Sequence, residues 1–220
     1  MKNHILKATR SFLWIIVLVA SSGVLRSQCP DSGETKVFQS KSGTGYYFYR
    51  FQGDGTFRYF LDGKKFSLND KDGAPGKTYL FIDDMAYEPL LIEKAQILEY
   101  TKSTNTLDIL RAQAKYEQQY FKKIDPAMVI QDYGPTTTKN PDGSDNRMFY
   151  LWKKESAPGK TPATQYLAST VVKDGLFVMS FMPVSGKASE DDMIHRILNY
   201  ASHFGTVSSD QCAQVLAPSK

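Results

Sequence analysis

The chain has 220 residues, with 27 Lys and Arg residues against 23 Asp and Glu residues. Residues 1–27 contain four of the basic residues and no acidic residue, so the rest of the chain is formally neutral. A neutral chain without a basic stripe excludes the usual electrostatic means of binding nucleic acid, and we expect no nucleic acid among its partners.

Residues 1–27 have the pattern of a secretory signal peptide: basic residues, an apolar run over 12–20, and small residues at 21–23. The apolar run is shorter than the roughly 20 residues of a membrane-spanning helix. We expect cleavage near Ser27 and an exported, periplasmic or extracellular location without a stable membrane span. The alternative is an uncleaved anchor. The absence of an Asn-x-Ser/Thr sequon favours the periplasm.

Two cysteines, Cys29 and Cys212, lie near the two ends of the mature chain. In an exported protein we expect them to form a disulfide. The bridge would close a loop of most of the domain, which the chain-entropy treatment values at about 5 kcal/mol. A paired cysteine leaves no thiol for catalysis. We therefore expect residues 28–220 to form one domain that the disulfide closes.

Two aromatic-rich segments, 46–51 and 56–61, predict the strands of a hairpin. A three-residue loop would pair Tyr49 with Tyr59 and collect six large side chains on one face. Burial of that face favours this register, although it places Arg50 opposite Arg58. A third strand from residue 64 would complete a meander.

This register places Tyr46, Phe48 and Phe60 on the opposite face of the hairpin. Exposed aromatic rings can stack on sugars or lie against a partner protein. The sequence therefore predicts that any exposed aromatic binding surface comprises these three residues. The alternative is that the aromatic hairpin only contributes to the core.

Residues 78–82 and 86–93 predict a second hairpin. Pro89 cannot donate a backbone hydrogen bond, so the later strand is expected at a sheet edge. The alternative for residues 89–100 is a helix. We expect the hairpin, followed by a short helical turn.

The next segment predicts one long helix and two strands. Asn105 is a suitable N-cap with Asp108 three positions later, and Pro126 follows the end of the helix. The apolar stripe is expected to comprise Leu107, Leu110, Ala114, Phe121 and Ile124. Strands are expected at 128–133 and 148–153, separated by a long polar loop.

The clearest folding signal is a β-hairpin over 164–183 that leads into an amphipathic helix. Asp-Gly at 174–175 favours a tight turn, which would place Val172 opposite Phe177. Both strands are apolar on both faces, so we expect them to be central and covered.

The final helix is predicted to begin after Ser189, an N-cap with Asp192 three residues on, and to end at Gly205. Its apolar stripe is expected to comprise Met193, Ile194, Ile197, Leu198, Ala201 and Phe204. The order of strands, hairpin and helix in this half of the chain is loosely similar to PsbP/Mog1-like domains. The resemblance rests on element order and implies no functional residue.

Together these elements predict an α+β fold: one domain with a mostly antiparallel sheet of about six to nine strands and two main helices. The C-terminal hairpin and helix form its most strongly specified part.

A polar stripe on the final helix contains His195, Asn199 and His203 at spacings of four. It could face a metal or a ligand, but no carboxylate or thiol cluster completes a site, so a solvated helix face is favoured. We assign no catalytic residue and expect no metal or cofactor. The HExxH and GxSxG motifs are also absent.

These observations favour a non-enzymatic binding or envelope-associated protein, with an envelope protein or a glycan as partner. The alternative is a carboxylate-based hydrolase that acts on an envelope or glycan substrate.

Overall fold

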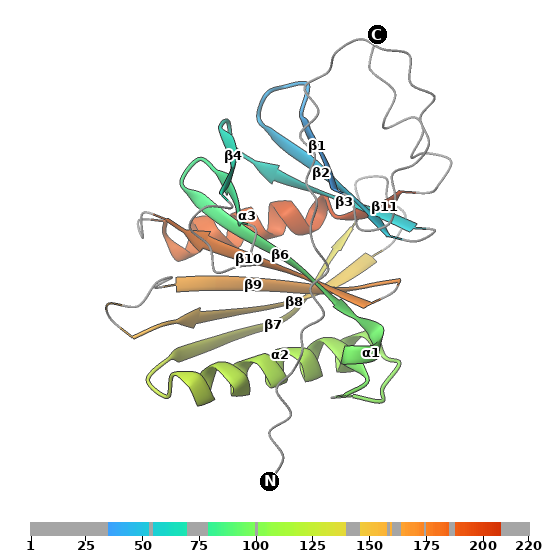
Figure 1. Cartoon of the computed structure of the whole chain (residues 1–220), viewed down its shortest axis with the longest axis vertical. Helices are drawn as coiled ribbons and strands as arrows, with labels where there is room; N and C mark the ends of the chain where they lie inside the picture. The colour runs from blue at the N-terminus through green and yellow to red at the C-terminus, as the bar shows by residue number, and fades with distance from the viewer. Residues whose placement is uncertain are drawn as a thin grey trace.

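The computed structural model describes residues 35–52, 55–69, 79–99, 101–139, 146–157, 159, 164–173, 175–184 and 188–207. Within these ranges the chain has the expected α+β fold, built mostly from antiparallel strands (Figure 1). The predicted signal peptide, Cys29 and Cys212 lie outside the described residues.

The strands form two antiparallel sheets rather than the one expected. The larger has the order β4-β5-β6-β10-β9-β8-β7. Its strands are β4 (Phe66–Asn69), β5 (Tyr79–Ile82), β6 (Met85–Glu93), β7 (Val129–Lys139), β8 (Asn146–Glu155), β9 (Thr164–Val172) and β10 (Gly175–Pro183). The smaller sheet has the order β1-β2-β3-β11. Its strands are β1 (Thr35–Gln39), β2 (Gly45–Gln52), β3 (Gly55–Asp62) and β11 (Gly205–Val207).

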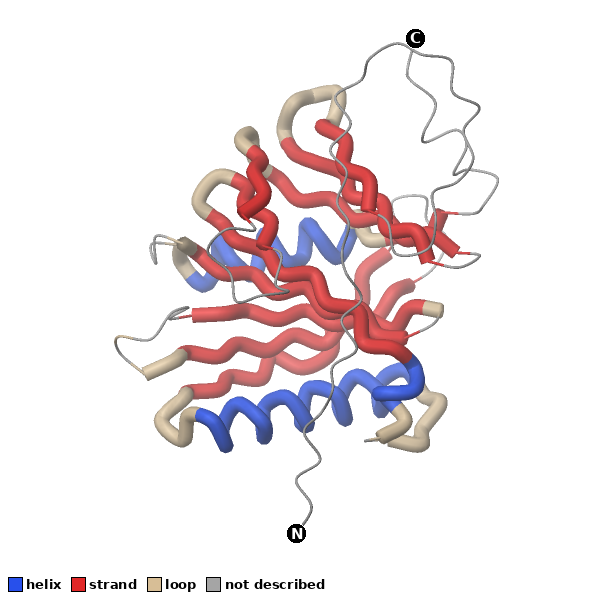
Figure 2. The backbone as a smooth tube through the Cα atoms, in the orientation of Figure 1, coloured by secondary structure: helices blue, strands red, loops and turns tan. Residues whose placement is uncertain are grey.

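The seven-stranded sheet is covered on both faces (Figure 2). The helices are α1 (Lys94–Ile97), α2 (Thr106–Ile124) and α3 (Glu190–Ser202). One face of the sheet shares a core with α3 and the four-stranded sheet. The other face packs against α2 and α1. The two main helices therefore lie on opposite sides of the sheet.

The central hairpin of β9 and β10 has the predicted faces but a different register. Thr170 lies opposite Phe177, and Val172 lies opposite Gly175 instead of Phe177. Gly175 is therefore the first residue of β10, where it pairs with β6. A Cβ atom at Gly175 would overlap the carbonyl oxygen of Ile92. Gly175 is needed because strand β6 approaches it closely, and not because it lies in the turn that we expected.

The hairpin of β2 and β3 differs from the predicted register by one residue. Gln52 pairs with Gly55, so two residues connect the strands instead of three. Arg58 now lies opposite Tyr49, which separates it from Arg50 and removes the like-charge pair. Because side chains alternate along a strand, this slip exchanges the two faces of β2 relative to β3.

The expected third strand of this meander, β4, belongs to the other sheet. It pairs with β5, and the chain passes between the sheets at Gly63, whose φ is +139°. Asp83 holds this crossing: its carboxylate accepts hydrogen bonds from the backbone N–H groups of Lys64 (3.0 Å) and Lys65 (2.9 Å). The Lys64 bond is the main reason that the pKa of Asp83 is lowered.

The other predicted strands lie at the expected positions, but some differ in their place in the sheet or in their length. β5 and β6 form the expected hairpin, and α1 is the expected short helical turn. β6 is an inner strand, although its pairing with β5 ends at Tyr87, before Pro89. β7 continues to Lys139 through an irregularity at Asp132 and Gly134, where a loop was expected.

Both predicted helix N-caps are confirmed. The Asn105 side chain accepts a hydrogen bond from Leu107 N (2.9 Å), and Ser189 Oγ accepts one from Asp192 N (3.1 Å). Three other helix predictions are wrong. Ile124 and Leu198 are exposed rather than buried, and Gly205 begins β11 instead of ending the helix.

The register of the central hairpin can be tested at Gly175. We expect Gly175→Ala to lower the free energy of unfolding by about 1–3 kcal/mol, because the added methyl group meets rigid backbone. Gly205→Ala is the matched control, since its nearest new contact would be a side-chain atom 3.7 Å away. Urea unfolding measures both variants. Equal effects would contradict the observed pairing of β10 with β6.

Candidate functional site

The expected aromatic surface of Tyr46, Phe48 and Phe60 is wrong. Phe48 is fully buried and stacks on Tyr59 at 5.0 Å between ring centroids. Phe60, on the other face, is 8% exposed and packs against Tyr47. The half-buried Tyr46 donates a hydrogen bond to the Lys64 carbonyl (2.8 Å). The one-residue slip of register moves Phe48 to the core face, whereas Phe60 stays on the predicted outer face and is covered there by Tyr47 and His203.

The histidine stripe of α3 does not converge on a site. His195 is exposed, and Asn199 is half-buried. His203 Nδ1 donates to the Asn199 carbonyl (2.9 Å), and its ring packs against Phe60. Among the residues that the structure describes, no group of three or more His, Cys, Asp or Glu side chains could hold a metal ion.

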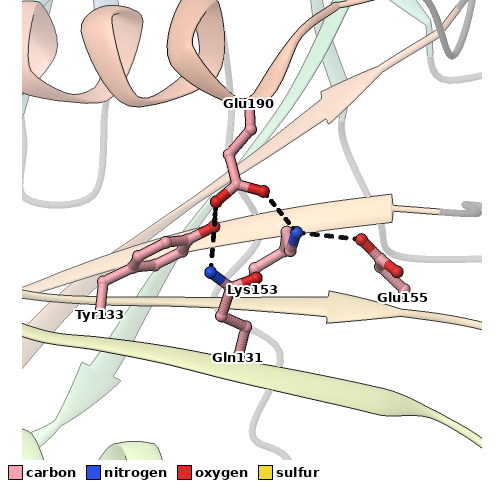
Figure 3. A network of polar contacts seen from close by, with 5 residues as sticks. All are labelled: Gln131, Tyr133, Lys153, Glu155 and Glu190. Atoms are coloured by element: carbon pink, nitrogen blue, oxygen red, sulfur yellow. Dashed lines mark hydrogen bonds and ion pairs between the residues drawn. The ribbon is translucent and has the colours of Figure 1, made fainter.

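A network around Glu190 joins α3 to the edge of the large sheet (Figure 3). Glu190 is the first residue of α3. One carboxylate oxygen accepts from Tyr133 (2.7 Å) and Gln131 (3.2 Å) of β7, and the other from Lys153 (2.8 Å) of β8. Lys153 also pairs with Glu155 at 3.0 Å. We call these five residues the Glu190 network.

The charges of the Glu190 network compensate one another. The hydrogen bond from Lys153, followed by that from Tyr133, lowers the pKa of Glu190. Lys153 is buried, and its two carboxylate partners outweigh desolvation and raise its pKa. A saturated network of this kind fixes the first turn of α3 on β7 and β8. We interpret it as structural.

A second polar group, between α2 and the large sheet, is not saturated. We call Gln113, Glu117, Trp152, Lys154 and Glu88 the α2 polar cluster. Gln113 is 1% exposed, yet neither amide atom has a hydrogen-bond partner among the described residues. The same holds for Trp152 Nε1 and Glu117 Oε2. Buried polar groups are nearly always paired, so this cluster is a candidate functional site.

The geometry of the α2 polar cluster follows from two elements. Gln113 and Glu117 lie one turn apart on α2 and share a face with Phe121. The Phe121 ring lies between two β8 side chains: its centroid is 6.1 Å from that of Trp152 and 3.3 Å from Lys154 Nζ. Lys154 is therefore buried over an aromatic face rather than extended into solvent.

Burial raises the pKa of Glu117 to about 7. The neighbouring Gln113 amide and the Lys154 ammonium act in the opposite direction, whereas the Glu88 carboxylate of β6 raises the pKa further. A carboxyl group with a pKa near 7 can donate or accept a proton at neutral pH. The α2 polar cluster therefore contains a group that is suited to acid–base catalysis.

The sequence contained a signal for this cluster that the strand prediction passed over. Lys154 continues the alternation of Tyr150 and Trp152, so it falls on the apolar face of its strand. Gln113 and Glu117 fall beside the predicted inner stripe of α2. A charged residue on an apolar face, aligned with polar residues of a facing helix, indicates such a site, but only the tertiary structure pairs the two elements.

The solvent side of α2 carries a further feature, which we call the α2 outer patch. Tyr116, Tyr120 and Ile124 recur at spacings of four, with exposed fractions of 40%, 50% and 59%. Lys123, three residues after Tyr120 and therefore on the same side of the helix, is exposed beside them and completes the patch. Neighbouring exposed apolar side chains mark interaction surfaces more often than isolated ones do.

Stability should depend on pH through Glu117. Its pKa is about 7 in the folded chain and about 4.5 in the unfolded chain. Between these values the unfolded chain loses the proton first, so rising pH destabilises the fold. We expect Glu117→Gln to stabilise the protein at pH 8 by up to about 3 kcal/mol and to have little charge-related effect at pH 4.

Urea unfolding at both pH values measures this effect. Glu99→Gln, which removes the same charge from an exposed position, is the matched control. A pH-independent effect of Glu117→Gln would show that Glu117 is ionised in the folded protein at neutral pH.

Comparison with known proteins adds no family to these observations. No protein-family model matches the chain, and no curated protein matches it significantly in sequence. In the described part of the chain, the helices are too short or too polar to cross a bilayer.

Proposed function

We propose that this chain is an exported, non-enzymatic binding protein that associates with a component of the cell envelope through the α2 outer patch. The observation that carries this proposal is the exposure of Tyr116, Tyr120 and Ile124 on a helix whose other side is already buried in the core. Apolar side chains that stay exposed side by side on a helix support a role in contact with a partner.

Export and the Cys29–Cys212 disulfide remain part of the proposal, and the sheet register is compatible with the disulfide. Thr35, Arg50, Phe57 and Thr206 lie in one row across the four-stranded sheet. The start of β1 and the end of β11 are therefore at the same end of this sheet, three strand spacings or about 14 Å apart.

Cys29 precedes Thr35 by six residues, and Cys212 follows Val207 by five. Each extended residue spans about 3.3 Å, so both segments are long enough for the two cysteines to meet. We expect peptide mass analysis of the exported protein without reductant to yield one cross-linked pair. Recovery of both cysteines alkylated from the native protein would contradict the disulfide.

Binding can be tested with the purified mature chain and isolated envelope fragments. We expect a variant with Tyr120→Ser, Ile124→Ser and Lys123→Gln to bind roughly tenfold more weakly or worse, because it removes both apolar contact and positive charge. The control carries Leu198→Ser, Lys64→Gln and Lys65→Gln, which alter exposed positions elsewhere. Thermal melting of each variant verifies folding. Equal binding by both variants would exclude the α2 outer patch.

The alternative function is a carboxylate-based hydrolase, and the α2 polar cluster favours it specifically. Glu117, with its pKa near 7, would act as the general acid, and the neighbouring Glu88 as the second carboxylate. Release of sugar from envelope glycan by the wild-type chain, lost in Glu117→Gln, would establish the hydrolase and overturn the non-enzymatic proposal.

A further inference from the structure

The long helix α2 is anchored unevenly along its length. Its fully buried side chains all lie in its first half, and they are Leu110, Gln113 and Ala114. Among residues 115–124, all of which the structure describes, none is fully buried, and three are half-buried: Glu117, Gln118 and Phe121. Packing of buried side chains supplies most of the stability of a helix in a protein, so the second half of α2 is held more weakly than the first.

The sheet surface beside this second half is polar. Lys154 of β8, which lies over the Phe121 ring, is the register partner of Gln165 in β9. Gln165 donates a hydrogen bond to Ser180 of β10, and Glu88 of β6 lies opposite Ser180. A polar band therefore crosses four strands here, whereas the first half of α2 shares a hydrophobic cluster with side chains of β10.

Glu117 meets this polar band from the second half of α2. The groups that act on its carboxyl are Lys154, Glu88 and, on its own helix, Gln113, while the remaining members of the band are uncharged. Burial raises the pKa of Glu117, the Glu88 carboxylate raises it further, and the other two groups offset only part of this rise. An ionised Glu117 is therefore less stable in the docked helix than in water.

We infer that residues 115–124 form a pH-dependent lid over the α2 polar cluster, which is docked while Glu117 carries a proton and opens locally when Glu117 loses it. We call this segment the α2 lid. The buried first half of α2 and the pairing of β7 with β8 anchor its two ends, so the rest of the fold stays closed. Opening gives a ligand access to Gln113 and Trp152, whose polar atoms have no partner among the described residues in the closed state. The inference does not depend on what the α2 outer patch binds.

Opening of the α2 lid should increase as the pH rises from about 4.5 to about 7. The pKa of Glu117 is about 7 in the docked helix and about 4.5 when the carboxyl is in water. Between these values the open lid loses the proton first, so each pH unit favours opening by up to about tenfold. The effect levels off above pH 7, where both states are ionised.

Trp152 provides a direct probe of the α2 lid, because Trp14, the other tryptophan, belongs to the predicted signal peptide. The test is hydrogen exchange of the purified mature chain, followed by NMR at pH 5 and pH 7, with each rate divided by that of an unstructured peptide at the same pH. We expect the Trp152 Nε1–H group and the amides of residues 115–124 to lose protection by roughly tenfold or more between the two pH values. At both values they should exchange at least about tenfold faster than the amides of β10.

Three variants identify the group that titrates. Glu117→Gln should abolish the pH dependence to within about twofold, because an amide does not titrate. Glu99→Gln, the exposed matched control, should behave as the wild type does. Glu88→Gln should reduce the change, since it removes a carboxylate that raises the pKa of Glu117. Thermal melting verifies that each variant folds.

Two results would overturn the inference. Exchange of the α2 lid as slow as that of β10 would show that it opens only by global unfolding. An unchanged pH dependence in the folded Glu117→Gln variant would exclude Glu117 as the group that controls opening.

Discussion

The fold depends on one constraint: strand β10 is buried along nearly its whole length, on both faces. A strand that is apolar on both sides needs a cover on each, because unpaired apolar surface costs about 25 cal/mol per Å² left in water. Here α1 and α2 supply one cover, and α3 with the four-stranded sheet supplies the other. The position of β10 between β6 and β9 completes its backbone hydrogen bonding.

The two faces of the large sheet differ in how their buried polar groups are satisfied. On the α3 side, the carboxylate of Glu190 and the ammonium of Lys153 satisfy one another and their neighbours, so the network adds a fixed orientation to the helix. On the α2 side, Gln113 and Trp152 retain polar atoms without partners among the described residues. Because a half-satisfied interior is costly, the second arrangement is the one that requires a functional explanation.

Three sets of side chains with different roles alternate along the sequence of α2. Leu110 and Ala114 face the core, Gln113 and Glu117 form the edge of the α2 polar cluster, and Tyr116 and Tyr120 face solvent. A helix needs only one apolar side to dock on a sheet. The second apolar side therefore supports surface binding, while the buried carboxyl supports the enzymatic alternative. Turnover and envelope-binding measurements separate the two.

Local interactions could be predicted from the sequence, and they include both helix caps, the β5–β6 hairpin and the faces of β9 and β10. Each depends on residues that are close in the chain, such as Asn105 with Leu107, so few arrangements compete. The α+β class follows from the same elements.

Register and partner choice were decided by the tertiary structure. Phe48 is buried because β2 pairs with β3 one residue from the predicted alignment, and Gly175 begins β10 because β6 approaches it closely. Glu117 and Lys154 likewise lie close together only because α2 packs on β8. Side-chain alternation along a strand is a local property that the sequence determines, but which strand or helix meets each face depends on distant segments and on the burial that they complete.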